Sequence, residues 1–339
     1  MVATTALHPI LIVVLSSLVL TASGLQVFPR TNMKRRSFGG VHSVLGSDID
    51  IDTVVANGTA AAALRRGGGG GAIDSNLSLL DSPADAYFSL AAKGEASSKM
   101  SVAKTFSAAI LGGLYVGLGG MVSLAVSGNM PGVAATNPGL VKFTFAALFP
   151  VALFLCLQGG AQLFTGNTAT MSAAWFEKKV TLKDVLKNWV IAYAGNLIGC
   201  AGFAAACSYS GVLAGGAGTM ASGMAVAKTS MEFGPIVVRA ICCNWLVCLA
   251  VFCASQAKDM MGRYIGILLP ISAFVSIGFE HSVANMFLLP AGLLAGAPVS
   301  VITAIVRNLL PVTLGNAIAG ALVVGGGFSW QFGKLGEGK

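Results

Sequence analysis

Charged side chains are scarce in this chain. Asp, Glu, Lys and Arg make up only 10% of its 339 residues, whereas 55% are hydrophobic and the mean hydropathy is +0.78. A soluble domain has about 25% charged residues, so this deficit points to segments embedded in lipid. The net charge of +8 fits basic flanking loops and a basic leader, and it does not indicate nucleic-acid binding.

The seven cysteines show no pattern of a disulfide framework or a metal site. They all fall within apolar segments, and no pair of Cys-x-x-Cys motifs with nearby histidines occurs. We therefore expect small buried apolar side chains, with no disulfide, no metal and no cofactor. The cysteines are Cys156, Cys200, Cys207, Cys242, Cys243, Cys248 and Cys253.

Histidine is equally rare, and one of the three stands in an apolar run. His8 and His42 belong to the N-terminal region, whereas His281 and its neighbour Glu280 are the only ionisable side chains between Tyr264 and Val306. An ionisable residue inside a membrane segment is a functional candidate by default. Catalysis usually needs several placed polar groups, so this sequence argues against an enzyme.

The first 81 residues predict targeting and linker segments. Residues 1–24 resemble a signal leader, because Ile10 to Leu20 is apolar but shorter than the roughly 20 residues of a membrane span. Residues 25–81 form a transit-like stretch and linker, with basic residues and no acid up to position 47 and a glycine run at 67–71. This two-part pattern favours a plastid envelope, and the plasma membrane is the alternative.

Ordered structure is expected from Ser82 onward. Ser82 and Pro83 are typical of a helix start, and residues 82–102 predict an amphipathic helix at the membrane surface with its lead-in. Residues 103–328 then form the membrane domain, followed by a tail at 329–339. The expected spans lie near 106–127, 141–176, 185–209, 236–257, 264–297 and 300–327.

Two of these spans are too long for a single crossing. Phe143 to Phe176 contains no Asp, Glu, Lys, Arg or His over 34 residues, and the fifth span is similarly long. One crossing needs about 20 residues, so we expect each run to break in the middle of the membrane and continue as a half-helix. Broken helices are tolerated where the freed backbone lines a cavity or is buried in protein.

An internal repeat supports this reading. Asn188 is followed by Gly195-Asn196, and Asn308 is followed at the same spacing by Gly315-Asn316. The two patterns fall in the third and the sixth span. Because three spans separate them, the two halves must have inverted topology. We therefore predict an all-α membrane protein with two inverted three-helix repeats.

Basic residues separate into two groups that predict the orientation. The larger group lies on the side of both termini, which is then cytoplasmic or stromal. It contains Lys93, Lys99, Lys104, Lys178, Lys179, Lys183, Lys187, Lys258 and Arg263, and the smaller group contains Lys142, Lys228, Arg239 and Arg307.

Five motifs between residues 82 and 328 resemble the signatures of the formate/nitrite transporter family. In chain order they are Leu163–Asn167, Asn188-Trp189 with Gly195-Asn196, Asn244–Ala250, Gly278–Met286 and Asn308–Asn316. The resemblance implies an aquaporin-like protomer that assembles as a homopentamer in the lipid bilayer, with one pore in each subunit.

The resemblance also implies positions for the residues of the pore. Phe149 and Leu153 match narrow points lined by the second span, and Leu163, Phe164 and Thr165 match a mobile loop at the break. Val247 and Phe274 match the far constriction, His281 and Asn316 match the central polar site, and Lys228 matches a lysine in the outer vestibule. One departure is Gln162, where the family usually has glutamate.

The expected function is the transport of small monovalent weak-acid anions, namely nitrite or formate and, less strongly, lactate or hydrosulfide. Protons are expected to take part near His281, because a buried charge tends to be neutralised. A passive anion channel without proton coupling is the first alternative. An aquaporin-type channel for neutral solutes is a weaker one, because it needs paired Asn-Pro-Ala boxes and Asn137-Pro138-Gly139 is a single imperfect match.

Overall fold

The computed structural model describes residues 79–337, which are almost entirely helical. Within this range the β contact is a single isolated bridge between Leu80 and Ala257. The leader and most of the linker predicted from the sequence lie outside the described residues. Six segments are long and apolar enough to cross a membrane, which confirms the predicted all-α membrane fold.

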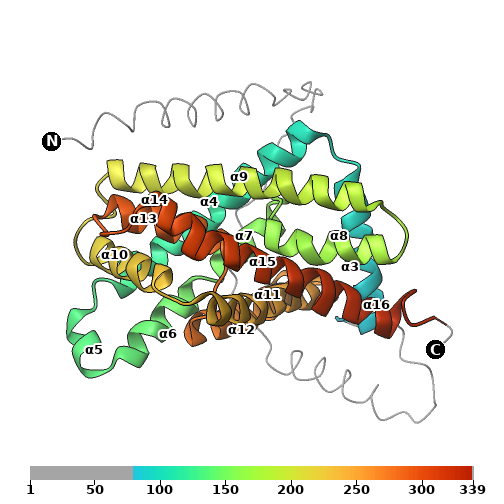
Figure 1. Ribbon diagram of the computed structural model, residues 1–339. Helices are drawn as coiled ribbons and strands as arrows, with labels where there is room; N and C mark the ends of the chain where they lie inside the picture. The colour runs from blue at the N-terminus through green and yellow to red at the C-terminus, as the bar shows by residue number, and fades with distance from the viewer. Residues whose placement is uncertain (1–78, 338–339) are drawn as a thin grey trace, which may run out of the picture. The chain divides into compact units, whose positions relative to one another are not determined.

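The six spans follow one another along the chain (Figure 1). They are α4 (Val102–Ser127), α6 with α7 (Pro138–Leu148 and Val151–Gln158), α9 (Leu182–Tyr209), α11 (Phe233–Gln256), α12 (Met260–Ile277) and a continuous run formed by α14 (Val301–Ala304), η2 (Ile305–Leu309), α15 (Leu310–Ile318), η3 (Ala319–Gly326) and α16 (Gly327–Phe332). Shorter helices are α3 (Pro83–Ser98), α5 (Pro131–Thr136), α8 (Phe164–Phe176), α10 (Gly215–Thr229) and α13 (Ser282–Leu294).

Both overlong apolar runs break where the sequence predicts. α7 gives way to the half-helix α8, and α12 gives way to the half-helix α13. Gly160 and Gly278 lie at the two breaks with φ values of +67° and +87°. This left-handed conformation is open to glycine and costly for other residues, so each glycine allows the chain to leave one helix and enter the next.

The two halves of the domain use the same polar contacts at their breaks. Asn196 Oδ1 accepts a hydrogen bond of 2.8 Å from the backbone N–H of Phe164, and Asn316 Oδ1 accepts one of 2.8 Å from that of Ser282. Each asparagine also donates through Nδ2 to two backbone carbonyls. The Asn-x6-Gly-Asn repeat therefore supplies the side chains that satisfy the backbone freed at each break.

The surface helix α3 packs over the half-helix α8. Ser82 Oγ accepts a hydrogen bond from the N–H of Asp85, and Pro83 takes the first helical position, as the sequence predicts. α3 packs on α8 so closely that a Cβ atom at Gly94 would collide with the carbonyl of Thr170. The helix ends at Ser98, within the stretch 82–102 that was predicted to hold it and its lead-in.

A buried carboxylate joins α3 to the end of α8 and to the C-terminal segment. The Tyr87 hydroxyl donates to Glu177 Oε1 over 2.7 Å, and the Ser329 hydroxyl and the Lys334 backbone N–H donate to the same oxygen over 3.0 and 3.1 Å. Burial, and then the hydrogen bond to Glu177, raise the pKa of Tyr87 above its usual value. The phenol therefore keeps its proton and remains a donor to Glu177.

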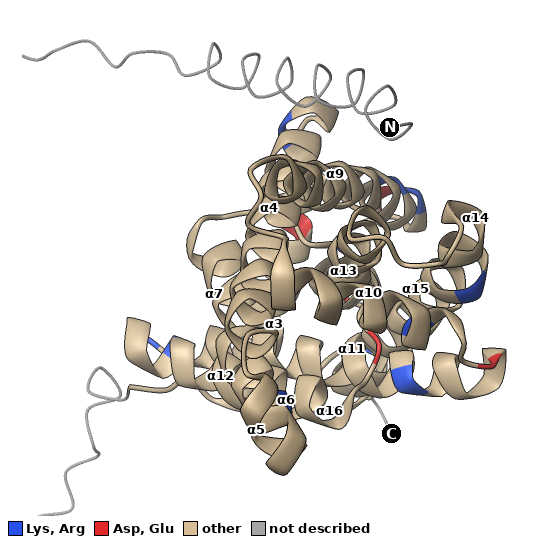
Figure 2. Cartoon of the chain, turned by 90° about the vertical axis from the view of Figure 1, so that its left-hand side faces the viewer, with Lys and Arg blue, Asp and Glu red and all other residues tan. Residues whose placement is uncertain are grey.

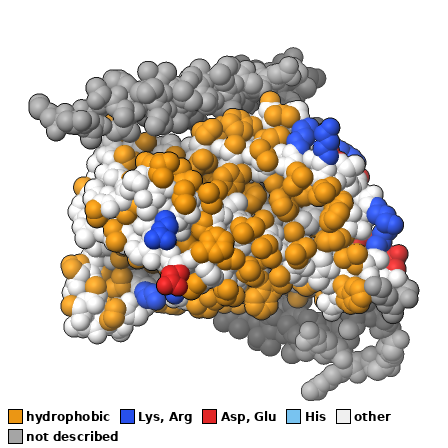
Figure 3. Space-filling view, viewed as in Figure 1, with side chains coloured by type: hydrophobic (Ala, Val, Ile, Leu, Met, Phe, Trp, Pro, Cys, Tyr) orange, Lys and Arg blue, Asp and Glu red, His pale blue; other side chains and the backbone are white. Residues whose placement is uncertain are grey.

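The surface agrees with a lipid environment. Figure 3 shows a broad hydrophobic face, with charged side chains lying toward its two ends. Figure 2 shows how few Lys, Arg, Asp and Glu residues the described helices carry. We call the end with α3 and α16 the inner face and the end with α5 and α10 the outer face (Figure 1).

Candidate functional site

Three spaces follow one another between the outer and the inner face. An outer vestibule of about 360 Å³ is lined by residues that include Lys142, Phe149, Lys228, Phe274 and His281. A central chamber and an inner recess, each of about 10 Å³, continue the path. A volume of that size is close to the space of one water molecule, so the pathway is narrow between the vestibule and the inner face.

Two aromatic rings separate the outer vestibule from the central chamber. Phe149 and Phe274 line both spaces, and their rings meet edge to face with centroids 6.4 Å apart. The Phe274 ring also stacks over the imidazole of His281 at 5.8 Å. We call this pair the outer slit. It groups Phe149 with Phe274, whereas the family resemblance groups Phe149 with Leu153.

Two leucines separate the central chamber from the inner recess. Leu153 of α7 and Leu163 at the first break line both spaces, and we call them the inner slit. Val247 of α11 lines the central chamber between the slits rather than a constriction of its own. Leu163 and His281 hold corresponding places in the two repeats, because each is the N-cap residue of its half-helix.

His281 is buried, and both of its ring nitrogens have partners. Nδ1 accepts a hydrogen bond of 2.9 Å from the backbone N–H of Ala284, and Nε2 lies 3.0 Å from Thr165 Oγ1. Because Nδ1 acts as an acceptor, a neutral ring carries its proton on Nε2 and donates it to Thr165. The imidazolium form would place an N–H donor against the Ala284 N–H, so the fold favours neutral histidine.

Three of the predicted site residues face the protein rather than the three spaces. The Phe164 ring packs edge-on against Trp189 and Tyr193. Asn316 holds the backbone of the second break. Thr165 is fully buried, and it reaches the site through its hydroxyl contact with His281.

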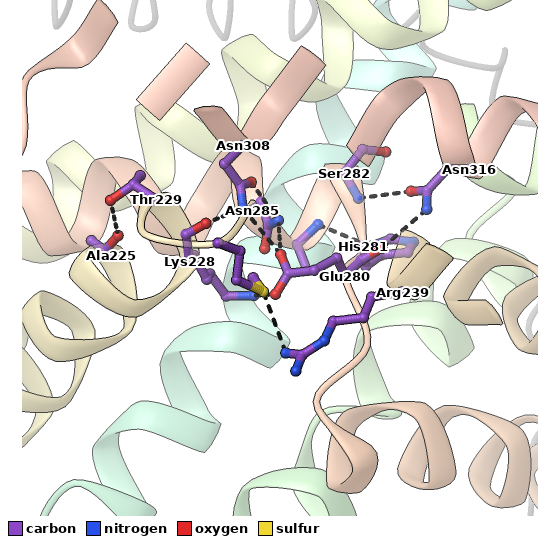
Figure 4. Close-up of polar contacts among 12 residues, drawn as sticks. Ala225, Lys228, Thr229, Arg239, Glu280, His281, Ser282, Asn285, Asn308 and Asn316 are labelled. Atoms are coloured by element: carbon purple, nitrogen blue, oxygen red, sulfur yellow. Dashed lines mark hydrogen bonds and ion pairs between the residues drawn. The ribbon is translucent and has the colours of Figure 1, made fainter. Parts of the chain in front are cut away.

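Lys228 does not stand free in the outer vestibule. Its ammonium group lies 2.9 Å from Glu280 Oε1, and the side chains are 15% and 3% exposed. Glu280 Oε2 accepts hydrogen bonds from the amides of Asn285 and Asn308 over 2.7 and 3.2 Å (Figure 4). The sequence did not reveal this pair, because Lys228 and Glu280 are far apart in the chain and α10 was not predicted as a helix.

Gln162 occupies the corresponding position in the first repeat. Asn167 Nδ2 donates to Gln162 Oε1 and to Asn188 Oδ1, each over 2.8 Å. Gln162 Nε2 lies near Ser97 Oγ and Met100 Sδ, at 3.4 and 3.7 Å. The amide thus keeps one of the two asparagine hydrogen bonds that Glu280 accepts, without its charge and without a lysine partner among the described residues.

The inner recess contains a lysine that the sequence analysis assigned only to the basic face. Lys93 of α3 lines this space together with Cys156, Leu163 and Asn167. Lys93 remains accessible at the surface, and the protein packed around it lowers its pKa below the usual value by desolvation. Its position in a surface helix, far along the chain from the first break and outside any motif, concealed its place beside the path.

These features define a multi-pass membrane transport protein: inverted repeats, two broken spans and a narrow path with a buried histidine between two apolar slits. The sequence model of the formate/nitrite transporter family matches residues 84–330. The chain belongs to the formate/nitrite transporter family, as its motifs indicate, and its relatives are transporters or channels rather than enzymes.

Several relatives and solved structures are similar to this chain. A protein of Methanothermobacter thermautotrophicus named a probable formate transporter is 39% identical over 261 residues, which is 72% of this chain and 94% of that protein. A formate channel of Bacillus thuringiensis is 41% identical over 63% of this chain and 82% of that protein. A solved FNT family ion channel has a TM-score of 0.68 at 26% identity, covering 73% of this chain and 98% of its own. A pentameric formate channel with formate bound has a TM-score of 0.61 at 27% identity, covering 69% and 98%.

Proposed function

We propose that this protein carries formate across a membrane, that a proton moves with it, and that His281 takes part in the step. The observation that supports this most directly is the contact of His281 Nε2 with Thr165 beside a chamber whose other walls are apolar. The names of the relatives favour formate. Nitrite, lactate and hydrosulfide have the same weak-acid chemistry and remain substrates for the test.

The lining of the chamber supports the part of the proposal that concerns the proton. Its lining is Val116, Phe149, Ala152, Leu153, Leu163, Val247, Ile271, Phe274 and His281, without a cationic side chain. Moving an isolated carboxylate from water into such surroundings is so costly that the group tends to neutralise instead. Formic acid, unlike formate, carries no charge through the slits.

The hydrogen-bond geometry supports neutral His281 as the proton donor. His281 lines the central chamber, and Thr165 Oγ1, buried in the wall, accepts the Nε2–H of the neutral ring. When Nε2 gives its proton to an anion in the chamber, Nδ1 takes a proton from water in the vestibule, so that the ring stays neutral and does not become an imidazolate. A passive anion channel lacks this exchange and is the alternative.

The assembly and the membrane extend the proposal. The solved pentameric formate channel supports a homopentamer with one path per subunit.

The acid-free basic segment near the N-terminus supports a location in the plastid envelope, and a fluorescent fusion of residues 1–60 tests this location. A fusion found only at the plasma membrane contradicts that location.

Uptake by purified protein in liposomes tests the function. Labelled formate, nitrite and lactate are offered separately under an inward proton gradient, with protein-free liposomes as the control. We expect formate to accumulate against its own gradient and a protonophore to abolish the accumulation. Flux that follows the membrane potential and ignores the proton gradient would support the passive channel, and absence of any anion flux would contradict the proposal.

A further inference from the structure

The outer vestibule contains more positive charge than its buried ion pair uses. Lys142, Lys228 and Arg239 line it, and Glu280 is the one acid in its lining. Lys228 and Glu280 neutralise each other at 2.9 Å. An anion entering the vestibule therefore meets the unpaired charges of Lys142 and Arg239, and it meets Lys228 only as one half of a dipole.

Arg239 is held at the entrance by its backbone, and its side chain is left available. The carbonyl of Arg239 accepts the N–H of Glu280 over 3.4 Å, which fixes α11 beside the second break and next to His281. The exposed guanidinium donates from Nη1 to Met231 Sδ over 3.3 Å (Figure 4). A thioether is a weak acceptor, so most of the five N–H donors have no partner among the described residues.

The inverted repeat shows that packing does not require this arginine. In the first repeat the corresponding backbone contact joins the Gln162 N–H to the carbonyl of Ala108 over 3.1 Å. Alanine thus performs the backbone role at the inner break. The guanidinium of Arg239 is an addition on the outer side, where it faces the wide vestibule.

We propose that Arg239, assisted by Lys142, is the site that captures anions with two terminal oxygens at the outer mouth. A guanidinium presents two parallel N–H groups that match the oxygens of a carboxylate, which an ammonium group cannot do. Formate, lactate and nitrite have this geometry, whereas hydrosulfide does not. This inference rests on the proposed anion transport and assigns the capture step to residues other than Lys228.

Uptake of labelled formate into proteoliposomes at low ionic strength tests the site. Two unit charges 4 Å apart in water attract each other by about 1 kcal/mol, or about fivefold in occupancy. We expect Arg239→Gln to raise the KM for formate by about fivefold without changing the maximal rate, and added salt to shrink the difference. Arg239→Lys should keep the salt-sensitive attraction but should still raise the KM for formate relative to wild type.

Arg307→Gln is the matched control. Arg307 is exposed and belongs to the same basic group, but it does not line the vestibule. An Arg239→Gln variant with the same KM and salt dependence as wild type and Arg307→Gln overturns the inference while formate transport stands. A wild-type protein that carries no anion overturns the proposed function and, with it, this site.

Discussion

Replacing Glu280 by glutamine alone should destabilise the protein more than removing both charges of its ion pair. Glu280 accepts from Lys228 through one oxygen and from Asn285 and Asn308 through the other. Glutamine has one acceptor and one donor group. In either orientation its NH₂ group faces a donor, which is the lysine ammonium or the two asparagine amides.

The expected size follows from burial. Removing one partner of a buried ion pair costs about 3–5 kcal/mol, whereas replacing both by neutral groups of similar size is often close to neutral. The Lys228 side chain is 15% exposed and can regain some water, so we expect a loss near the lower limit, about 3 kcal/mol. The double variant Glu280→Gln/Lys228→Met should lie within about 1 kcal/mol of wild type.

Thermal unfolding of the protein in detergent measures this order. Because membrane oligomers often unfold irreversibly, midpoints should be compared at one heating rate. The predicted order is wild type and double variant together, with Glu280→Gln well below both. A single variant as stable as wild type, or a double variant less stable than the single one, would refute the view that the pair is coupled and buried.

Three further predictions concern the path itself. Phe274→Ala should open the outer slit, and uptake assays should show lactate and larger monocarboxylates crossing at rates closer to that of formate. Loss of folded protein without a change in selectivity would instead indicate a packing role, for which Phe→Ala changes cost about 3–5 kcal/mol. His281→Asn should fold and assemble but lose acid-stimulated uptake, measured beside wild type under an imposed proton gradient; unchanged pH dependence would remove His281 from the proton step. Lys93→Gln should slow the entry of formate from the inner face at neutral pH. Because the pKa of Lys93 is lowered, the lysine loses its charge as the pH rises through that lowered value, so the wild-type rate should converge on the variant's rate at high inner pH. Parallel plots of rate against pH would contradict the role of Lys93.

Helix breaks were predictable because composition and length alone require them. An apolar run of 34 residues cannot cross once and stop, and the glycines at positions 160 and 278 provide the turns. The role of the asparagine repeat could also be predicted, because a backbone freed at a helix break in a membrane must find polar partners. These features depend on local sequence, so the spans and their inverted order could be predicted.

The state of the charges was not predictable in this way. Lys228 and Glu280 meet because the glycine-rich helix α10 packs on α13 and brings its last turn to the second break. A glycine-rich sequence is typical of a loop in soluble proteins, so the sequence did not predict this helix. The directions of Phe164 and Leu163 could not be predicted either, because adjacent residues at a break diverge according to how the half-helix is rotated.

The count of protons that cross with each formate tests the central claim most directly. Proteoliposomes containing a trapped pH-sensitive dye and labelled formate report both fluxes in the same sample, with the membrane potential clamped by potassium and valinomycin. The account predicts that one proton enters with each formate and that the rate does not change when the clamped potential is varied. Formate entry without internal acidification, at a rate that follows the potential, would contradict it.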